Sequence, residues 1–109
     1  MINFIKRILY RSIENKEISY KDIEELVKNQ DALIIDVRSV QEYEEGHING
    51  AINIPVYNIK KEINKIEKNT ERIIILYCSS GGRSKKAKSE LEKLGYKNVY
   101  NLKEGIDNI

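Results

Sequence analysis

Apolar residues along this chain follow two periods, one typical of buried strands and one typical of amphipathic helices. Two nearly continuous apolar runs, Leu33–Val37 and Ile73–Tyr77, are rich in β-branched residues. Runs of this kind predict strands that are covered on both faces of a parallel sheet. Shorter runs at 51–54 and 99–102 predict two further strands, and Ile18 begins the folded domain.

Helical spacing fills the intervals between these strands. Apolar residues three or four positions apart predict helices after Ser19, after Pro55 and from Ser84. Asp22, three residues beyond Ser19, approximates a capping box, and Gly95 is the predicted C′ residue of the last helix. The alternation of strands and helices predicts the α/β class, with a parallel sheet and helices on both faces. The predicted apolar stripes are Ile23, Leu26, Val27; Ile59, Ile63, Ile66; and Ala87, Leu91, Leu94.

Residues 1–16 are an amphipathic segment ahead of a domain predicted to occupy 17–109. Isoleucine and leucine at positions 2, 5, 9 and 13 share one helical face, while lysine and arginine interrupt any long apolar run. The segment is too broken for a signal peptide or a membrane span. We expect a helix packed on the domain, and contact with a membrane surface or a partner stays open as an alternative.

The amino-acid composition argues against several kinds of function. The 109 residues carry 19 Lys and Arg against 17 Asp and Glu, and these charges are interspersed, which argues against a nucleic-acid partner. One cysteine excludes an internal disulfide, and one histidine argues against a zinc site, so no metal is predicted. A free reactive thiol suits a reducing compartment, which predicts a cytoplasmic location.

The single cysteine, Cys78, directly follows the strand 73–77 and precedes Ser-Ser-Gly-Gly-Arg-Ser. Gly81 and Gly82 permit backbone angles that let successive N–H groups turn inward as an anion-binding nest. The helix that follows adds its positive dipole end, and Arg83 adds a cation. These features predict a thiol pKa below the free value of about 8.5 and a nucleophilic thiolate; the alternative is a buried structural cysteine. The predicted binding loop is Ser79, Ser80, Gly81, Gly82, Arg83 and Ser84.

A second dense segment runs from Ile35 to Pro55. Asp36 stands at the carboxyl end of a buried strand, where it could serve a ligand or brace the neighbouring backbone. Arg38 and Glu42 are expected to pair across the turn that leaves the strand. His47 follows a glycine and is expected to be a structural side chain.

The two segments together resemble the rhodanese family. Cys-Ser-Ser-Gly-Gly-Arg-Ser matches its loop pattern Cys-x-x-Gly-x-Arg-Ser/Thr, and the second segment matches Asp-x-Arg, Glu-Tyr, Gly-His-Ile, Gly-Ala and Asn-Ile-Pro. The related dual-specificity phosphatases have one residue more between cysteine and arginine, so the shorter loop favours sulfur over phosphate. The chain departs from the family at Glu104, which replaces a glycine, and in lacking the tryptophan-bearing final helix. We expect this truncation to affect stability more than chemistry.

The resemblance implies a three-layer α/β/α fold with a five-stranded parallel sheet in the order 3-2-4-5-1. It also implies a sulfurtransferase that carries sulfane sulfur as a persulfide on Cys78, with Asp36, Arg38 and Glu42 as supporting residues. The donor would be thiosulfate or a thiol or protein persulfide, and the acceptor a thiophile. No cofactor is expected beyond the covalent persulfide, and the protein is expected to be a monomer.

Three alternatives use the same residues differently. The domain could be a protein-interaction module, or a sulfur carrier that works only with a dedicated partner. A phosphatase or arsenate reductase is disfavoured by the short loop and by the absence of a second cysteine for a redox relay.

Overall fold

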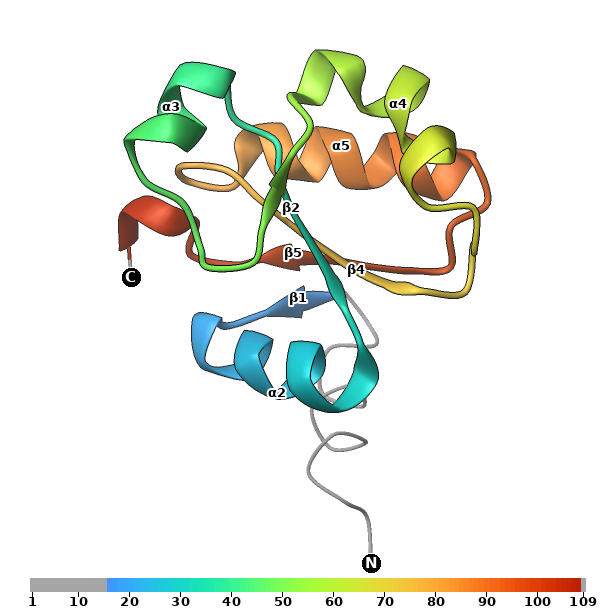
Figure 1. Cartoon of the computed structure of the whole chain (residues 1–109), viewed down its shortest axis with the longest axis horizontal. Coiled ribbons are helices and arrows are strands. Elements are labelled where there is room, and N and C mark those ends of the chain that lie inside the picture. The colour runs from blue at the N-terminus through green and yellow to red at the C-terminus, as the bar shows by residue number, and fades with distance from the viewer. Residues whose placement is uncertain (1–15, 109) are drawn as a thin grey trace, which may run out of the picture.

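The computed structural model describes residues 16–108, which form a parallel sheet with helices on both faces (Figure 1). The strands are β1 (Glu17–Ile18), β2 (Leu33–Asp36), β3 (Ile52–Asn53), β4 (Ile73–Tyr77) and β5 (Asn98–Leu102). The helices are α2 (Tyr20–Gln30), α3 (Val40–Glu45), α4 (Ile59–Ile66) and α5 (Gly82–Lys93), with short 3₁₀ turns η1 (Val56–Asn58) and η2 (Ile106–Asn108).

The strands follow the order β1-β5-β4-β2-β3 and every pairing is parallel, which confirms the predicted order. The last residues of the two central strands, Asp36 and Tyr77, lie opposite one another. The chain leaves β2 toward one edge of the sheet and β4 toward the other. A crevice at the carboxyl ends of strands opens at such a switch point.

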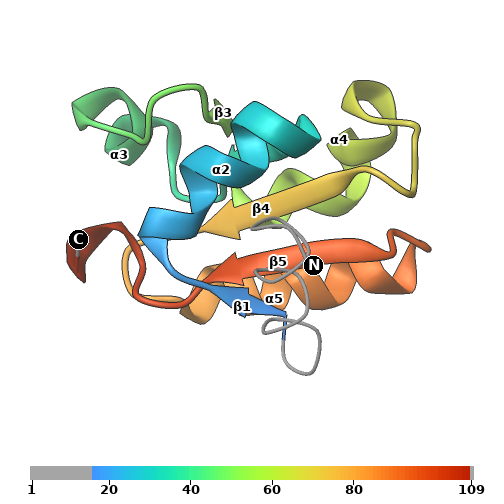
Figure 2. The ribbon, with the colours of Figure 1, turned by 90° about the horizontal axis from the view of Figure 1, so that it is seen from below.

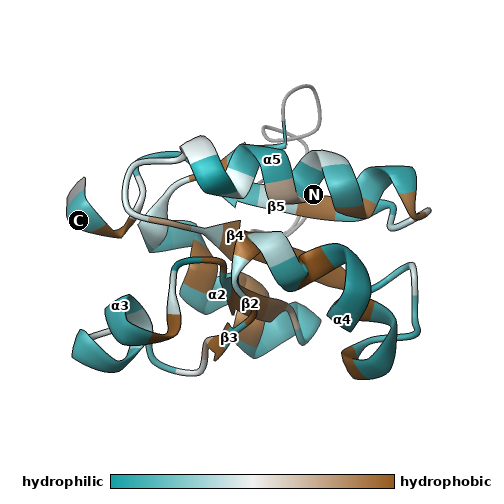
Figure 3. Cartoon of the chain, turned by 90° about the horizontal axis from the view of Figure 1, so that it is seen from above, coloured by the Kyte–Doolittle hydropathy of each residue, from teal (hydrophilic) through white to brown (hydrophobic). Residues whose placement is uncertain are grey.

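Two hydrophobic clusters hold the layers together. One joins α2 to its face of the sheet through Ile23, Leu26, Ile75 and Leu102, and the other joins α4 and α5 to the opposite face. Figure 2 shows α2 alone on its side, across the sheet from α5. Hydrophobic segments gather in β2, β3 and β4, whereas the outer turns of α5 are hydrophilic (Figure 3). Burial of one apolar stripe per helix therefore explains the three layers.

The ends of the helices show which local predictions hold. Gly95, at φ 99°, donates to Glu92 O, and the next N–H donates to Leu91 O, so the predicted helix end is confirmed as a Schellman motif. Ser19 is the N-cap of α2, but its hydroxyl donates to the Asp22 carboxylate at 3.1 Å and caps no backbone N–H. The predicted capping box at this helix is therefore wrong.

Two predicted stripe residues are only partly covered, since Val27 is 39% and Ile66 47% exposed. The predicted helix at 1–16 lies outside the described residues except for Lys16. Within residues 16–108, no helix combines the length and apolar character needed to cross a membrane.

Candidate functional site

The sulfur of Cys78 lies at the carboxyl end of β4, at the start of the loop that leads into α5. The residue is only 1% exposed, so the sulfur occupies the floor of the loop. Tyr77, which precedes it, accepts a 3.0 Å hydrogen bond from Ile48 N–H through its phenol oxygen. The strand end is thereby anchored immediately before the thiol.

Hydrogen-bond donors surround this sulfur. The Gly81 N–H donates to Cys78 Sγ at 3.1 Å, and the Ser84 hydroxyl lies 3.4 Å from it. Burial raises the pKa of the Cys78 thiol, but the Ser84 hydroxyl and the N–H groups of Ser84, Gly81 and Ser80 outweigh burial and hold the pKa below its ordinary value. The predicted direction is confirmed, and the donors responsible are amides and a hydroxyl.

The turn of the loop needs one glycine in a left-handed conformation. Gly81 adopts φ 110° and is the N-cap of α5, whereas Gly82 is the first helical residue and has no positive φ. Only Gly81 therefore uses the backbone freedom that the sequence allows at both positions. The helix also begins two residues earlier than Ser84, which places the Ser84 hydroxyl inside the first turn, beside the sulfur.

Arg83 pairs with Glu42 of α3. Its Nη1 and Nη2 donate to Glu42 Oε1 at 2.7 Å and Oε2 at 3.0 Å, and Nη2 also reaches Ser79 Oγ at 3.3 Å. The predicted pairing of Glu42 with Arg38 is wrong, because the first helical turn of α3 directs this carboxylate toward the loop. The Arg83 hydrogen bonds hold the Glu42 pKa far below its usual range.

Glu42 also organises the start of α3. Its Oε1 accepts from the Ser39 N–H at 3.0 Å, while Ser39 Oγ accepts from the Glu42 N–H at 3.2 Å. These reciprocal bonds form a capping box at a helix that periodicity did not reveal, although Ser-x-x-Glu is visible in the sequence. One carboxylate thus ties the helix start to the cysteine loop.

Asp36 and Arg38 form a separate, buried brace. Arg38 donates from Nη2 to Asp36 Oδ2 at 2.7 Å and from its N–H to Asp36 Oδ1 at 2.9 Å. Arg38 Nη2 also donates to Gly46 O at 2.6 Å, which secures the far end of α3. Neither residue hydrogen-bonds to residues 78–84 in the described part of the chain. Of the two roles considered for Asp36, a ligand group or a brace for the neighbouring backbone, the geometry supports the brace.

Asn101 of β5 is a site residue that the sequence reasoning missed. The Ser84 hydroxyl lies 2.5 Å from Asn101 Oδ1 and 3.1 Å from Gly81 O, in addition to its contact with Cys78. Asn101 is buried, and its Nδ2 has no hydrogen-bond partner among the described residues. An Asn101 amide turned to present Nδ2 to the Ser84 oxygen would leave the hydroxyl proton for the sulfur.

The C-terminal turn also reaches the loop. The N–H groups of Ile106 and Asp107 donate to the carbonyl oxygens of Cys78 at 2.9 Å and Ser79 at 3.1 Å. Figures 1 and 2 place this turn, α3 and the β4–α5 loop at the same end of the molecule. The segment therefore belongs to the wall of the site, a role that its departure from the family pattern did not suggest.

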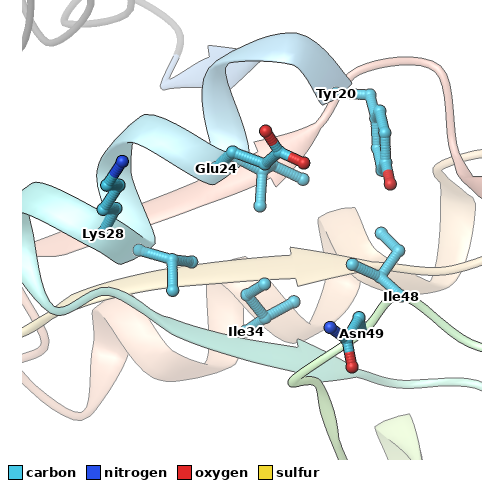
Figure 4. A pocket seen from close by; sticks show the side chains of 8 residues that line it. Tyr20, Glu24, Lys28, Ile34, Ile48 and Asn49 are labelled. Carbon is cyan, nitrogen blue, oxygen red and sulfur yellow. The ribbon is translucent and has the colours of Figure 1, made fainter.

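Other features lie apart from this chemistry. His47 stacks on Tyr43 with ring centroids 3.7 Å apart, and its Nδ1 lies 2.7 Å from Tyr43 O. A pocket of about 290 Å³ lies between α2, β2 and residues 48–49, and it is lined by Tyr20, Glu24, Lys28 and mostly aliphatic neighbours (Figure 4). Residues 16–108 contain no group of three His, Cys, Asp or Glu side chains that could hold a metal ion.

Comparison with known proteins places these observations in a family. The family model described as rhodanese-like domain matches residues 19–109. The chain is 38% identical over 91 residues to the putative sulfur carrier protein YrkF of Bacillus subtilis (strain 168), covering 83% of this chain and 48% of that protein. It is 34% identical over 93 residues to the tRNA uridine(34) hydroxylase of Buchnera aphidicola, covering 82% of this chain and 30% of that protein.

Among solved structures, the human single-domain sulfurtransferase TSTD1 superposes with a TM-score of 0.71 at 27% identity, covering 80% of this chain and 88% of that one. The chain spans less than half the length of the two curated relatives named above. The matched region includes both the cysteine loop and the Asp36–Pro55 segment. This chain, with its five-stranded parallel sheet and its cysteine at the carboxyl end of β4, therefore belongs to the rhodanese-like domain family.

Proposed function

We propose that this protein is a sulfurtransferase that carries sulfane sulfur as a persulfide on Cys78. The observation that carries the proposal is the thiol itself, which lies on the floor of a donor-lined loop that lowers its pKa. A thiolate is the nucleophile that attacks sulfur, and the same donors would hold the negative charge of a persulfide.

Transfer takes place in two displacements. The Cys78 thiolate attacks the outer sulfur of thiosulfate or of a thiol persulfide, a new S–S bond forms, and sulfite or thiolate leaves with the electron pair of the broken S–S bond. A thiol, protein thiol or cyanide then attacks the outer sulfur of the persulfide, and Cys78 leaves as thiolate. An S–S bond of about 2 Å carries the outer sulfur up from the floor of the loop toward its mouth.

The charges at the mouth favour some donors over others. Arg83 is the one cation of the binding loop, residues 79–84. Its two hydrogen bonds to the Glu42 carboxylate balance its charge. Within residues 79–84, a dianion would therefore meet amide donors and no unpaired cation. We expect a thiol or protein persulfide to be a better donor than thiosulfate.

A sulfur carrier that serves a dedicated partner is the second candidate. The observation that favours it is that the chain is similar to a protein named as a putative sulfur carrier. This candidate shares the persulfide chemistry and differs in the source of sulfur.

Intact-protein mass spectrometry under non-reducing conditions tests the proposal. The wild type and Cys78→Ala would each be measured before and after addition of thiosulfate or glutathione persulfide. We expect the wild type to gain the mass of one sulfur atom, to lose it to cyanide or a thiol, and to show ping-pong kinetics, whereas Cys78→Ala should do none of these. Turnover retained in Cys78→Ala would sink the assignment, and no gain with either donor would favour the partner-dependent carrier or an interaction module.

A further inference from the structure

The peptide group between Ser79 and Ser80 is held at both of its ends. Its N–H, which belongs to Ser80, helps to lower the pKa of the Cys78 thiol, and the next N–H along the loop, that of Gly81, donates to the Cys78 sulfur at 3.1 Å. Its carbonyl oxygen, which belongs to Ser79, accepts a 3.1 Å hydrogen bond from the Asp107 N–H. Because the N–H and C=O of a trans peptide point in opposite directions, fixing the carbonyl also fixes the direction of the N–H.

The neighbouring peptide repeats this arrangement. The Ile106 N–H donates to Cys78 O at 2.9 Å, so the Ser79 N–H of the same peptide is directed away from the C-terminal turn. Two successive N–H groups of the loop are thus oriented by two successive N–H groups of η2. An anion-binding nest depends on this kind of concerted orientation.

Gly105 makes the close approach possible. A Cβ atom at this position would lie 2.2 Å from Ser79 O, 2.6 Å from Ser79 C and 2.7 Å from Ser80 Cα. All three atoms belong to, or flank, the peptide whose N–H helps to lower the thiol pKa. Gly105 also adopts φ 74°, a conformation that side-chain-bearing residues rarely take.

We propose that the turn formed by residues 105–107 is a positioning element of the sulfur site, which holds the Cys78–Ser79 and Ser79–Ser80 peptides of the loop in place beside the sulfur. The proposal rests on the proposed function for its purpose, since these amides would hold the persulfide charge. The turn touches no reacting atom and acts through the two loop peptides. Rhodanese-like chemistry in this chain would therefore depend on residues about thirty positions beyond the cysteine.

The test is the pH dependence of Cys78 alkylation by iodoacetamide, which reports the thiol pKa because only the thiolate reacts. Gly105→Ala should push the Ser79–Ser80 peptide out of line and raise the midpoint by about one pH unit, which is a roughly tenfold loss of thiolate below the midpoint. Gly50→Ala is the matched control, because Gly50 has a similar φ of 88° and nothing within 4 Å of an added Cβ. It should lower the melting temperature through backbone strain and leave the midpoint unchanged.

A midpoint that stays at the wild-type value in folded Gly105→Ala would overturn the proposal, as would an equal shift in Gly50→Ala. If Gly105→Ala fails to fold, Asp107→Pro decides, because it removes the N–H that holds Ser79 O; it should raise the midpoint in the same direction, and an unchanged midpoint would refute the role of the turn. Alkylation requires no sulfur donor. A wild type that takes up no sulfur would therefore defeat the proposed function and leave this readout intact.

Discussion

Glu42 is the residue whose replacement tests the geometry of the site most directly. Its carboxylate caps α3 through Ser39 and holds Arg83 through two hydrogen bonds. Glu42→Gln preserves the size of the side chain and removes its charge. The capping contact to the Ser39 N–H is weakened, and the two bonds to the guanidinium lose their charge assistance.

The solvent exposure of the Arg83–Glu42 pair sets how much stability Glu42→Gln should lose. The side chains of Arg83 and Glu42 are 41% and 34% exposed, so solvent reduces the worth of the pair to about 0.5–1 kcal/mol. The weakened cap adds about 0.5 kcal/mol, at the low end for such contacts. A total of about 1–1.5 kcal/mol predicts a fall in melting temperature of at least about 4 °C for a domain of this size.

The pH dependence separates a charge effect from a packing effect. Because the folded-state pKa of Glu42 is lowered by Arg83, its contribution to stability is fully present above the unfolded pKa of about 4.3 and is lost as pH falls toward the folded pKa. The difference in melting temperature between wild type and Glu42→Gln should therefore be greatest at pH 7 and smaller at pH 3.5, where part of the contribution is already lost. Circular dichroism melts at both pH values measure it.

Glu45→Gln supplies the control, since Glu45 is an exposed carboxylate near the end of the same helix. It should change the melting temperature by less than about 2 °C at pH 7, as surface substitutions usually do. The reasoning would be refuted if Glu42→Gln were destabilised equally at pH 7 and pH 3.5, or if Glu45→Gln cost as much.

Two further outcomes are expected. Ser84→Ala should raise the Cys78 pKa, because it removes the hydroxyl that contributes most to lowering it, and the pH midpoint of alkylation should rise while Ser89→Ala, exposed on the same helix, leaves it in place. Tyr77→Phe should lower the free energy of unfolding by about 1–3 kcal/mol, because the buried Ile48 N–H loses its acceptor; a urea titration that shows no change would contradict this.

Most of the fold could be predicted from sequence because its signals are local. The β-branched runs at 33–37 and 73–77 have few alternatives to buried strands, and the Gly95 helix end follows from the steric freedom of glycine alone. Helix α3 was missed because six residues are too few to show an apolar period. Its Ser-x-x-Glu capping signature was the signal that could have found it.

In the candidate site, too, the local features could be predicted from the sequence and the contacts between distant residues could not. The candidate nucleophile, the glycine turn and the direction of the thiol pKa shift could be inferred from residues 78–84 alone, because a tight loop before a helix concentrates N–H donors. The partners of those residues could not be inferred. Glu42 pairs with Arg83 and not with Arg38, and Asn101 contacts Ser84. The N–H groups of the C-terminal turn donate to two carbonyl oxygens of the loop.

Each of these contacts joins residues that are far apart in the chain. They meet because the strands are parallel, so the carboxyl ends of all strands lie at the same end of the sheet. The sequence by itself determined which groups could do the chemistry. The tertiary structure alone decided which way those groups point, because two distant segments form a hydrogen bond only if the sheet places the donor and the acceptor next to each other.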